Sequence, residues 1–151
     1  MKLQSTNPTF SGCGFHHVAL RARDFDRSFA FYTEGLGFRP ALSWGAGETR
    51  AVLLDMGDGN YLEIFAASAG QIPAEGATGT GWPFLHLALR SDDVEADIER
   101  VRALGATITA EPKDVVVSDS AQTLHIAFFR GPDGEILELF QHRPAAGVAQ
   151  L

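Results

Sequence analysis

The sequence predicts an α+β protein built from two copies of one βαβββ module. Two internal repeats carry this prediction. Residues 15–21, FHHVALR, match residues 84–90, FLHLALR, at five of seven positions. Residues 58–65, DGNYLEIF, match residues 133–140, DGEILELF, at five of eight positions and in the same order along the chain. Self-similarity of this kind indicates a duplicated architecture.

We place the first module at residues 12–66 and the second at residues 82–142. Residues 67–81, between them, are rich in Ala, Gly, Ser and Thr, which is the composition of a flexible linker. A chain of 151 residues has the size of one domain, so the two modules are expected to form a single domain together.

The first module opens with an alternating strand and continues into a helix. Asp24 is placed to cap a helix that runs through Glu34, and the glycines of the segment 35–37 end it. Three short strands are expected next, near residues 38–44, 49–56 and 60–66. Gly-Asp-Gly at 57–59 predicts a tight hairpin turn before the last of them.

The second module repeats this order. Ser91 or Asp92 is placed to cap a helix in which apolar residues recur at helical spacing as far as Val101, and Gly105 ends it. Strands are expected near residues 106–110, 122–130 and 135–141. Gly-Pro-Asp-Gly at 131–134 predicts the corresponding hairpin turn.

Composition excludes several functional classes. The chain has 12 Lys and Arg against 19 Asp and Glu, and its net charge of −7 offers no basic surface for nucleic acid. No apolar run approaches the roughly 20 residues of a membrane span. The single cysteine, Cys13, cannot form an intramolecular disulfide, which fits a reducing compartment. We therefore expect a cytoplasmic protein that acts on a small molecule.

Four side chains at corresponding places form the candidate site. Alternation along the opening strands puts His17 and His86 on the face away from the aliphatic residues, and directs His16 to the face opposite His17. The same alternation in the last strands puts Glu63 and Glu138 among aromatic residues. A carboxylate in apolar surroundings is costly unless it is paired or binds a cation. Each module thus contributes one imidazole and one carboxylate.

Two interpretations of these residues are open. Each module could contain a core histidine whose ring nitrogens are hydrogen-bonded within the protein, and a glutamate at the sheet edge. Alternatively, two histidines and two glutamates bind one divalent Zn, Ni, Mn, Fe or Co ion, since mixed nitrogen and oxygen ligands suit these metals. The correspondence of all four positions favours the metal site.

The motifs that contain these residues resemble the vicinal oxygen chelate superfamily, which includes glyoxalase I, bleomycin-resistance proteins and extradiol dioxygenases. The resemblance covers about residues 12–142, and its motifs are FHHVAL at 15–20, SFAFY at 28–32, GLGF at 35–38 and GPDGEILEL at 131–139. It implies a curved eight-stranded half-barrel around one metal. The implied ligands are His17, Glu63, His86 and Glu138.

The four-ligand set is similar to that of glyoxalase I, and so implies a lyase or isomerase of the lactoylglutathione lyase type. The implied reaction is proton transfer next to a carbonyl through a metal-bound enediolate. By resemblance Glu138 is the catalytic base, Glu63 serves the other face, and glutathione is a possible cosubstrate. The predicted substrate-binding residues are Arg21, His125, Phe65 and Tyr61. A homodimer is expected from the same resemblance.

Two further functions remain as alternatives. An Fe(II) extradiol dioxygenase would cleave a catechol, and the aromatic residues around the site suit such a ligand. A non-catalytic protein of the bleomycin-resistance type would bind and sequester a small molecule. Four potential metal ligands favour neither alternative, because the dioxygenases use three and the resistance proteins usually lack the set.

Overall fold

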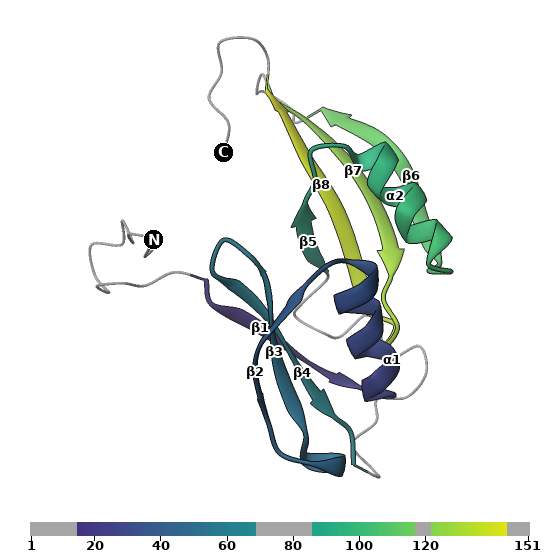
Figure 1. The fold of residues 1–151 in the computed structure, drawn as a ribbon. Coiled ribbons are helices and arrows are strands. Elements are labelled where there is room, and N and C mark those ends of the chain that lie inside the picture. Colours follow the sequence, from purple (N-terminus) through teal and green to yellow (C-terminus); the bar gives the residue numbers. More distant parts are fainter. Residues whose placement is uncertain (1–14, 69–85, 117–121, 145–151) are drawn as a thin grey trace, which may run out of the picture. The chain divides into compact units, whose positions relative to one another are not determined.

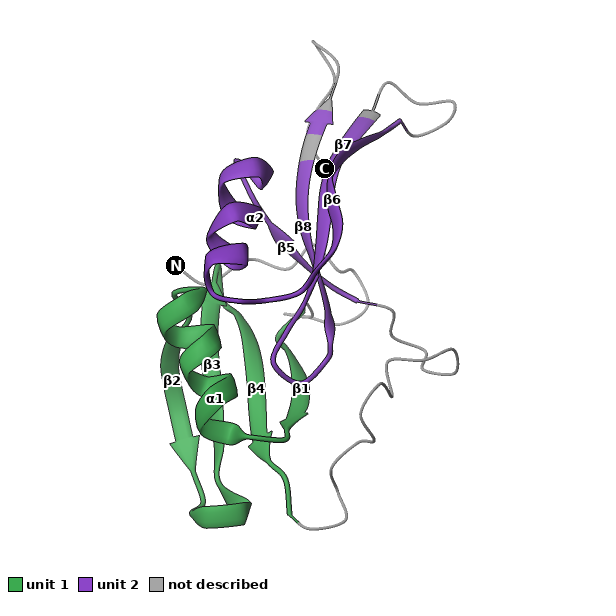
Figure 2. Ribbon diagram, turned by 90° about the vertical axis from the view of Figure 1, so that its right-hand side faces the viewer, with its two compact units in different colours: residues 1–73 green, residues 74–151 purple. Residues whose placement is uncertain are grey.

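The computed structural model describes residues 15–68, 86–116 and 122–144 (Figure 1). The chain divides into two compact units, residues 1–73 and 74–151 (Figure 2). Each unit contains one four-stranded sheet and the helix that packs on it. The predicted α+β class and the repeated βαβββ order are confirmed. The predicted module starts at 12 and 82, and most of the linker 67–81, lie outside the described residues.

The first unit has the strand order β1-β4-β3-β2, with β1 parallel to β4 and the other pairs antiparallel. Its strands are β1 (His17–Ala22), β2 (Arg39–Trp44), β3 (Ala51–Gly57) and β4 (Asn60–Ala66). Its helical segments are α1 (Phe25–Ala30), the π-helical turn η1 (Phe31–Gly35) and the 3-10 turn η2 (Gly47–Thr49).

The second unit has the equivalent order β5-β8-β7-β6, again with one parallel pair, β5 with β8. Its elements are β5 (Leu87–Arg90), α2 (Val94–Ala103), β6 (Ile108–Val116), β7 (Gln122–Arg130) and β8 (Ile136–Pro144). In both units the opening strand therefore lies beside the last strand, which brings the two repeated motifs of that unit together.

Both helices begin at an aspartate. Asp24 caps α1 as predicted, since its Oδ1 accepts a hydrogen bond of 3.0 Å from the amide of Arg27. The cap of α2 is Asp93 rather than Ser91 or Asp92, because Asp93 Oδ1 accepts from the Ala96 amide at 3.0 Å. The hydroxyl of Ser91 instead accepts from the Asp93 amide at 3.1 Å and supports that cap from outside the helix.

The end of the first helix differs from the prediction. The α-helix stops at Ala30 and continues as one π turn, in which the Leu36 amide donates to the Phe31 carbonyl five residues earlier, at 3.1 Å. The side chain of Tyr32 is fully buried and stacks on Phe38 with ring centroids 5.7 Å apart. The π turn thus adds a large aromatic residue to the core.

The hairpin turns follow the predictions, but the strand β6 is longer than expected. Asp58 and Gly59 have φ of 56° and 76°, as a type I′ turn between β3 and β4 requires. Strand β6 covers Ile108–Val116 instead of 106–110, although it contains Pro112. Proline is tolerated there because β6 is an edge strand and its register with β7 shifts between Ala110 and Lys113.

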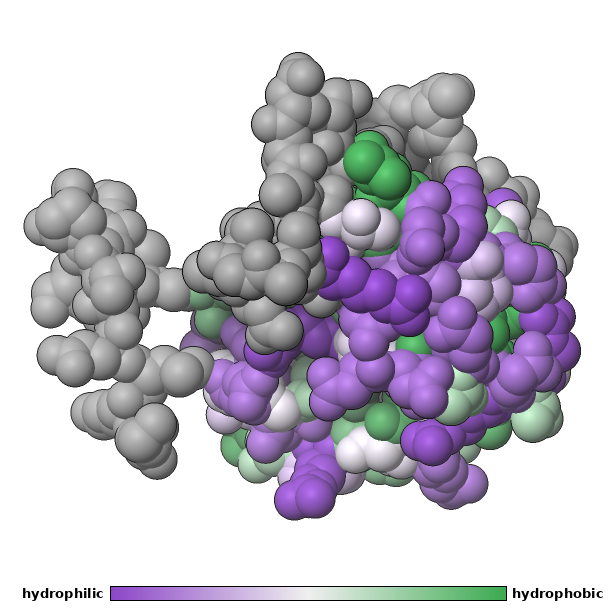
Figure 3. Space-filling model, turned by 90° about the horizontal axis from the view of Figure 1, so that it is seen from above, coloured by the Kyte–Doolittle hydropathy of each residue, from purple (hydrophilic) through white to green (hydrophobic). Residues whose placement is uncertain are grey.

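Each unit has its own hydrophobic core between sheet and helix. Leu54, Leu62 and Ile64 are at most 1% exposed in the first unit. Ile98, Phe129 and Leu137 are equally buried in the second. In the view of Figure 3 the described surface is mainly hydrophilic. None of the helices in the described ranges has the length and apolar character of a membrane span.

Candidate metal centre

The first half-site lies on the face of the first sheet opposite the buried aliphatic residues. Ala19 of β1 is the register partner of Glu63 of β4, so His17, two residues earlier, is on the same face and diagonal to Glu63. His17 Nε2 lies 3.4 Å from Glu63 Oε2. The imidazole is 42% exposed and the carboxylate 16% exposed. The predicted His–Glu pair of the first module is thus brought together.

The second half-site repeats this geometry. Ala88 of β5 is the register partner of Glu138 of β8, and His86 again lies two residues before that alanine. His86 Nε2 is 2.9 Å from Glu138 Oε2, and the carboxylate is only 8% exposed. The ring of His86 also meets Phe128 edge-on, with centroids 5.4 Å apart.

Burial changes the acidity of Glu138. Desolvation of the carboxylate raises its pKa above the usual value, and the neighbouring His86 opposes part of this rise. A carboxylate of raised pKa is a stronger base at neutral pH, provided that it is ionised. Glu138 therefore has the electrostatic setting of a proton acceptor.

The two pairs fit the coordination geometry of a divalent metal. Two ligand atoms bound at about 2.1 Å are about 3.0 Å apart at a right angle and about 3.4 Å apart at the tetrahedral angle. The nitrogen–oxygen separations of 3.4 and 2.9 Å match these values. Among the described residues, no three His, Cys, Asp or Glu side chains gather closely enough to hold an ion. Each unit by itself contains one His–Glu pair.

A third residue lies at the first pair and was not predicted. The sequence pattern directs His16 to the opposite face, but the structure brings its Nδ1 to 2.9 Å from His17 Nδ1. The ring of His16 stacks on Tyr61 with centroids 5.1 Å apart. His16 lies directly before β1, and its ring does not follow the alternation of the strand. The doubled histidine itself was the available signal.

The predicted substrate-binding residues of the first unit surround this half-site. Tyr61 and Phe65 of β4 share the face of Glu63, and Arg21 is the register partner of Phe65. Arg21 donates from a terminal guanidinium nitrogen to the Ala66 carbonyl at 3.1 Å, and its guanidinium lies 5.8 Å from the Phe65 ring centroid. A cation and two aromatic rings thus border the first pair.

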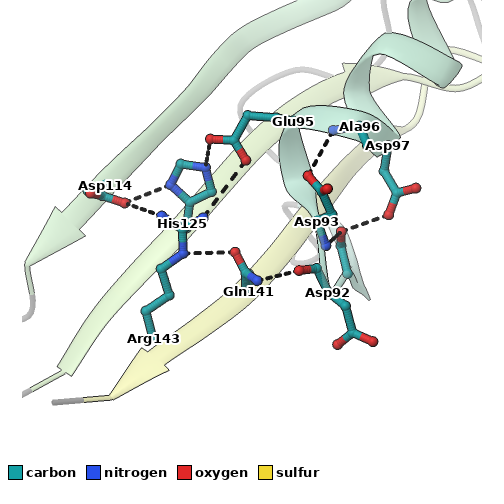
Figure 4. Close-up of polar contacts among 10 residues, drawn as sticks. Asp92, Asp93, Glu95, Ala96, Asp97, Asp114, His125, Gln141 and Arg143 are labelled. Atoms are coloured by element: carbon teal, nitrogen blue, oxygen red, sulfur yellow. Dashed lines mark hydrogen bonds and ion pairs between the residues drawn. The ribbon is translucent and has the colours of Figure 1, made fainter. Parts of the chain in front are cut away.

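His125 lies apart from the half-site of its unit. Phe128 is the register partner of Glu138, so alternation along β7 puts His125 on the other face of the sheet, toward α2. Its ring is 6% exposed and lies between two carboxylates, with Nδ1 2.6 Å from Asp114 and Nε2 2.7 Å from Glu95 (Figure 4). We therefore leave His125 out of the proposed site.

The surroundings of His125 tie four elements of the second unit together. Glu95 comes from α2, Asp114 from β6 and Arg143 from β8 (Figure 4). The guanidinium of Arg143 lies 3.5 Å from Asp114 and 3.8 Å from Glu95. These contacts give His125 a role in joining helix to sheet, and they account for a polar residue in the core.

Residues 14–139 match the family model described as the Glyoxalase/Bleomycin resistance protein/Dioxygenase superfamily. The chain belongs to this superfamily. The match spans both half-sites, and it confirms the resemblance found in the repeated motifs.

Relatives within the superfamily include proteins named as lactoylglutathione lyases. A probable lactoylglutathione lyase of Vibrio parahaemolyticus is 30% identical over 130 residues, which cover 86% of this chain and 91% of that protein. A lactoylglutathione lyase of Arabidopsis thaliana is 32% identical over 86% of this chain, but the match spans only 44% of the plant protein. A glyoxalase-like enzyme is the function that these names support.

Solved structures agree with this assignment. Glyoxalase I from Zea mays superposes with a TM-score of 0.66 at 27% identity, over 87% of this chain and 45% of the maize chain. A glyoxalase family protein from Enterococcus faecalis gives a TM-score of 0.67 at 28% identity, over 85% of this chain and 97% of that one. The fold is therefore shared with bacterial proteins of similar length and with part of a longer plant enzyme.

Proposed function

We propose that this chain is a divalent-metal-dependent lyase or isomerase of the glyoxalase type, which transfers a proton next to a carbonyl. The proposed ligands are His17, Glu63, His86 and Glu138. The metal would be Zn, Ni, Mn, Fe or Co, since these accept mixed imidazole and carboxylate ligands.

One observation carries the proposal: the same His–Glu pair occurs twice at the same register. In each sheet the histidine lies two residues before an alanine that pairs with the glutamate of the parallel neighbouring strand. Both modules keep the histidine, the glutamate, their register and a similar distance between them. Binding of one cation by both pairs would explain why these features are kept. The lactoylglutathione lyase names of the relatives favour the same function.

The residues then have distinct roles. A bound divalent metal supplies Lewis acidity, which stabilises negative charge on a substrate oxygen. We assign proton removal from the carbon next to the carbonyl to Glu138, whose side chain is the more buried of the two glutamates. Glu63 is more exposed and serves the opposite face of the substrate, where it returns or removes the proton.

The thiol part of the substrate would lie along the first sheet. Arg21 binds a carboxylate of the cosubstrate, and Phe65 and Tyr61 line the path toward Glu63. Glutathione is the proposed cosubstrate, because the relatives are named lactoylglutathione lyases.

Metal analysis followed by activity measurement tests the function. The purified chain is expected to bind one divalent metal and to convert the adduct of methylglyoxal with glutathione, whereas the chelated protein is inactive until metal returns. The same metal-loaded samples are offered other thiols, and catechol with an oxygen electrode. Oxygen uptake with catechol would favour the dioxygenase alternative, and absence of metal binding would overturn the proposal.

A further inference from the structure

The two half-sites differ in what supports their histidine. In the first unit His16 Nδ1 lies 2.9 Å from His17 Nδ1, the ring nitrogen of His17 that does not face Glu63. In the second module the residue before His86 is Leu85, whose side chain has no hydrogen-bonding atom. The contact to His16 is thus a feature of one half-site, and the proposed function does not use it.

The contact between the two nitrogens limits the tautomers that can form it. Two imidazole nitrogens at 2.9 Å are within hydrogen-bond range, and one of them must carry the proton while the other offers its lone pair. If His17 Nε2 binds a metal, that nitrogen uses its lone pair and carries no proton. The proton of neutral His17 is then on Nδ1, which donates to His16 Nδ1.

The setting of His16 holds its acceptor nitrogen in place. The His16 ring stacks on Tyr61 at an interplanar angle of 30°, and it meets the His17 ring edge-on at 86°. The backbone carbonyl of His16 accepts a hydrogen bond of 2.8 Å from the Tyr61 amide, so the residue is anchored to β4. Stacking and anchoring together keep Nδ1 directed at His17 and lower the entropy cost of the contact.

We propose that His16 is a positioning residue, which holds His17 in the tautomer that presents Nε2 to the metal. The inference rests on the proposed function, because it assigns a partner to one of the proposed ligands. Partners of metal-binding histidines fix the ring orientation and raise its basicity, and their loss typically costs about 10- to 100-fold in metal affinity.

The first measurement uses the unaltered chain with 15N-labelled histidine. In the zinc-loaded protein we expect His17 to show a protonated Nδ1 and a metal-bound Nε2, with a scalar coupling through the hydrogen bond to His16 Nδ1. Absence of that coupling at full zinc occupancy would overturn the inference. His86, measured in the same spectrum, serves as the internal control for metal occupancy.

The second measurement compares three proteins at one pH. His16→Leu removes the acceptor, and zinc affinity measured by chelator competition is expected to fall about 10- to 100-fold. His16→Asn restores an acceptor oxygen near the position of Nδ1 and is expected to recover most of the affinity. Equal zinc affinity in all three proteins would contradict the inference while leaving the proposed function intact. A wild-type chain that binds no divalent metal would contradict the proposed function instead.

Discussion

The two units carry the same pair of residues in different surroundings. In the first, His17 and Glu63 are 3.4 Å apart and the carboxylate is 16% exposed. In the second, His86 and Glu138 are 2.9 Å apart, the carboxylate is 8% exposed and burial raises its pKa. Duplication thus produced two similar ligand pairs, of which one has a second histidine against its imidazole and the other has the more buried carboxylate.

The largest expected effect concerns the two glutamates. Glu138→Gln should lower kcat by about 10²- to 10⁴-fold, the usual contribution of a positioned base. Glu63→Gln should lower it less, because that carboxylate is more exposed. Turnover of the methylglyoxal–glutathione adduct measures both, with bound metal quantified in each sample. A larger loss in Glu63→Gln would reverse the assignment of the two roles.

The two histidines should contribute to one shared ion. His17→Ala and His86→Ala are each expected to weaken metal binding by more than about 100-fold, beyond what loss of a supporting residue costs. Titration of the unaltered chain should give one metal ion per chain. Two independently bound ions per chain would contradict a shared site. Mixing the two variants also tests the predicted homodimer, since restored activity requires half-sites from different chains.

A smaller difference between the units is expected in the stability that each gains from the contacts of its helix. His125→Leu should destabilise the second unit by about 1–3 kcal/mol, because it removes two hydrogen bonds to charged partners. Asp26→Asn, which breaks the exposed bidentate pair with Arg50 in the first unit, should cost less than about 1 kcal/mol.

Chemical denaturation measures both attachments. His125 lies on the face toward α2, away from the proposed site. The kcat/KM of His125→Leu should therefore stay within about twofold of that of the unaltered protein, whereas a loss of about 1.4 kcal/mol would be a tenfold change. A selective rise in KM with normal stability would return His125 to the substrate site.

The smallest effect is a pH dependence in the metal-free protein. The folded-state pKa of Glu138 is raised, so folding favours its protonated form, and ionisation costs stability as pH rises through that pKa. Glu138→Gln removes this cost. The variant should therefore gain stability relative to the unaltered protein as pH rises above the ordinary carboxyl pKa of 4.5. Urea unfolding in the presence of a chelator measures the difference, and the exposed Glu48→Gln is the control.

The sequence was sufficient for the fold because the repeated segments are strands that pair with each other. FHHVALR and DGNYLEIF become β1 and β4, which lie side by side in parallel, and their counterparts become β5 and β8. Alternation predicts a shared face for the histidine and the glutamate of each module. The structure brings His17 to 3.4 Å from Glu63 and His86 to 2.9 Å from Glu138. Side-chain alternation is informative here because the register of β1 with β4, and of β5 with β8, determines which side chains lie next to each other.

The structure differs from the sequence predictions at residues that do not follow a regular strand or helix pattern. His16 lies just before its strand, and its ring contacts His17 instead of pointing to the opposite face. The predicted strand ended at residue 110, but β6 continues through Pro112, which an edge position and a register shift allow. The π turn at Phe31–Gly35 depends on burial of Tyr32, which only tertiary packing determines.

Proline occurs in one edge strand of each sheet: Pro40 of β2 lies at a register shift against β3, and Pro112 of β6 lies within the shift between Ala110 and Lys113. Each of these two strands therefore lacks an amide donor at one position. An incoming extended chain would meet an interrupted row of hydrogen-bonding groups at either strand. The β2 and β6 edges of the two sheets thus resist self-templated growth into fibres.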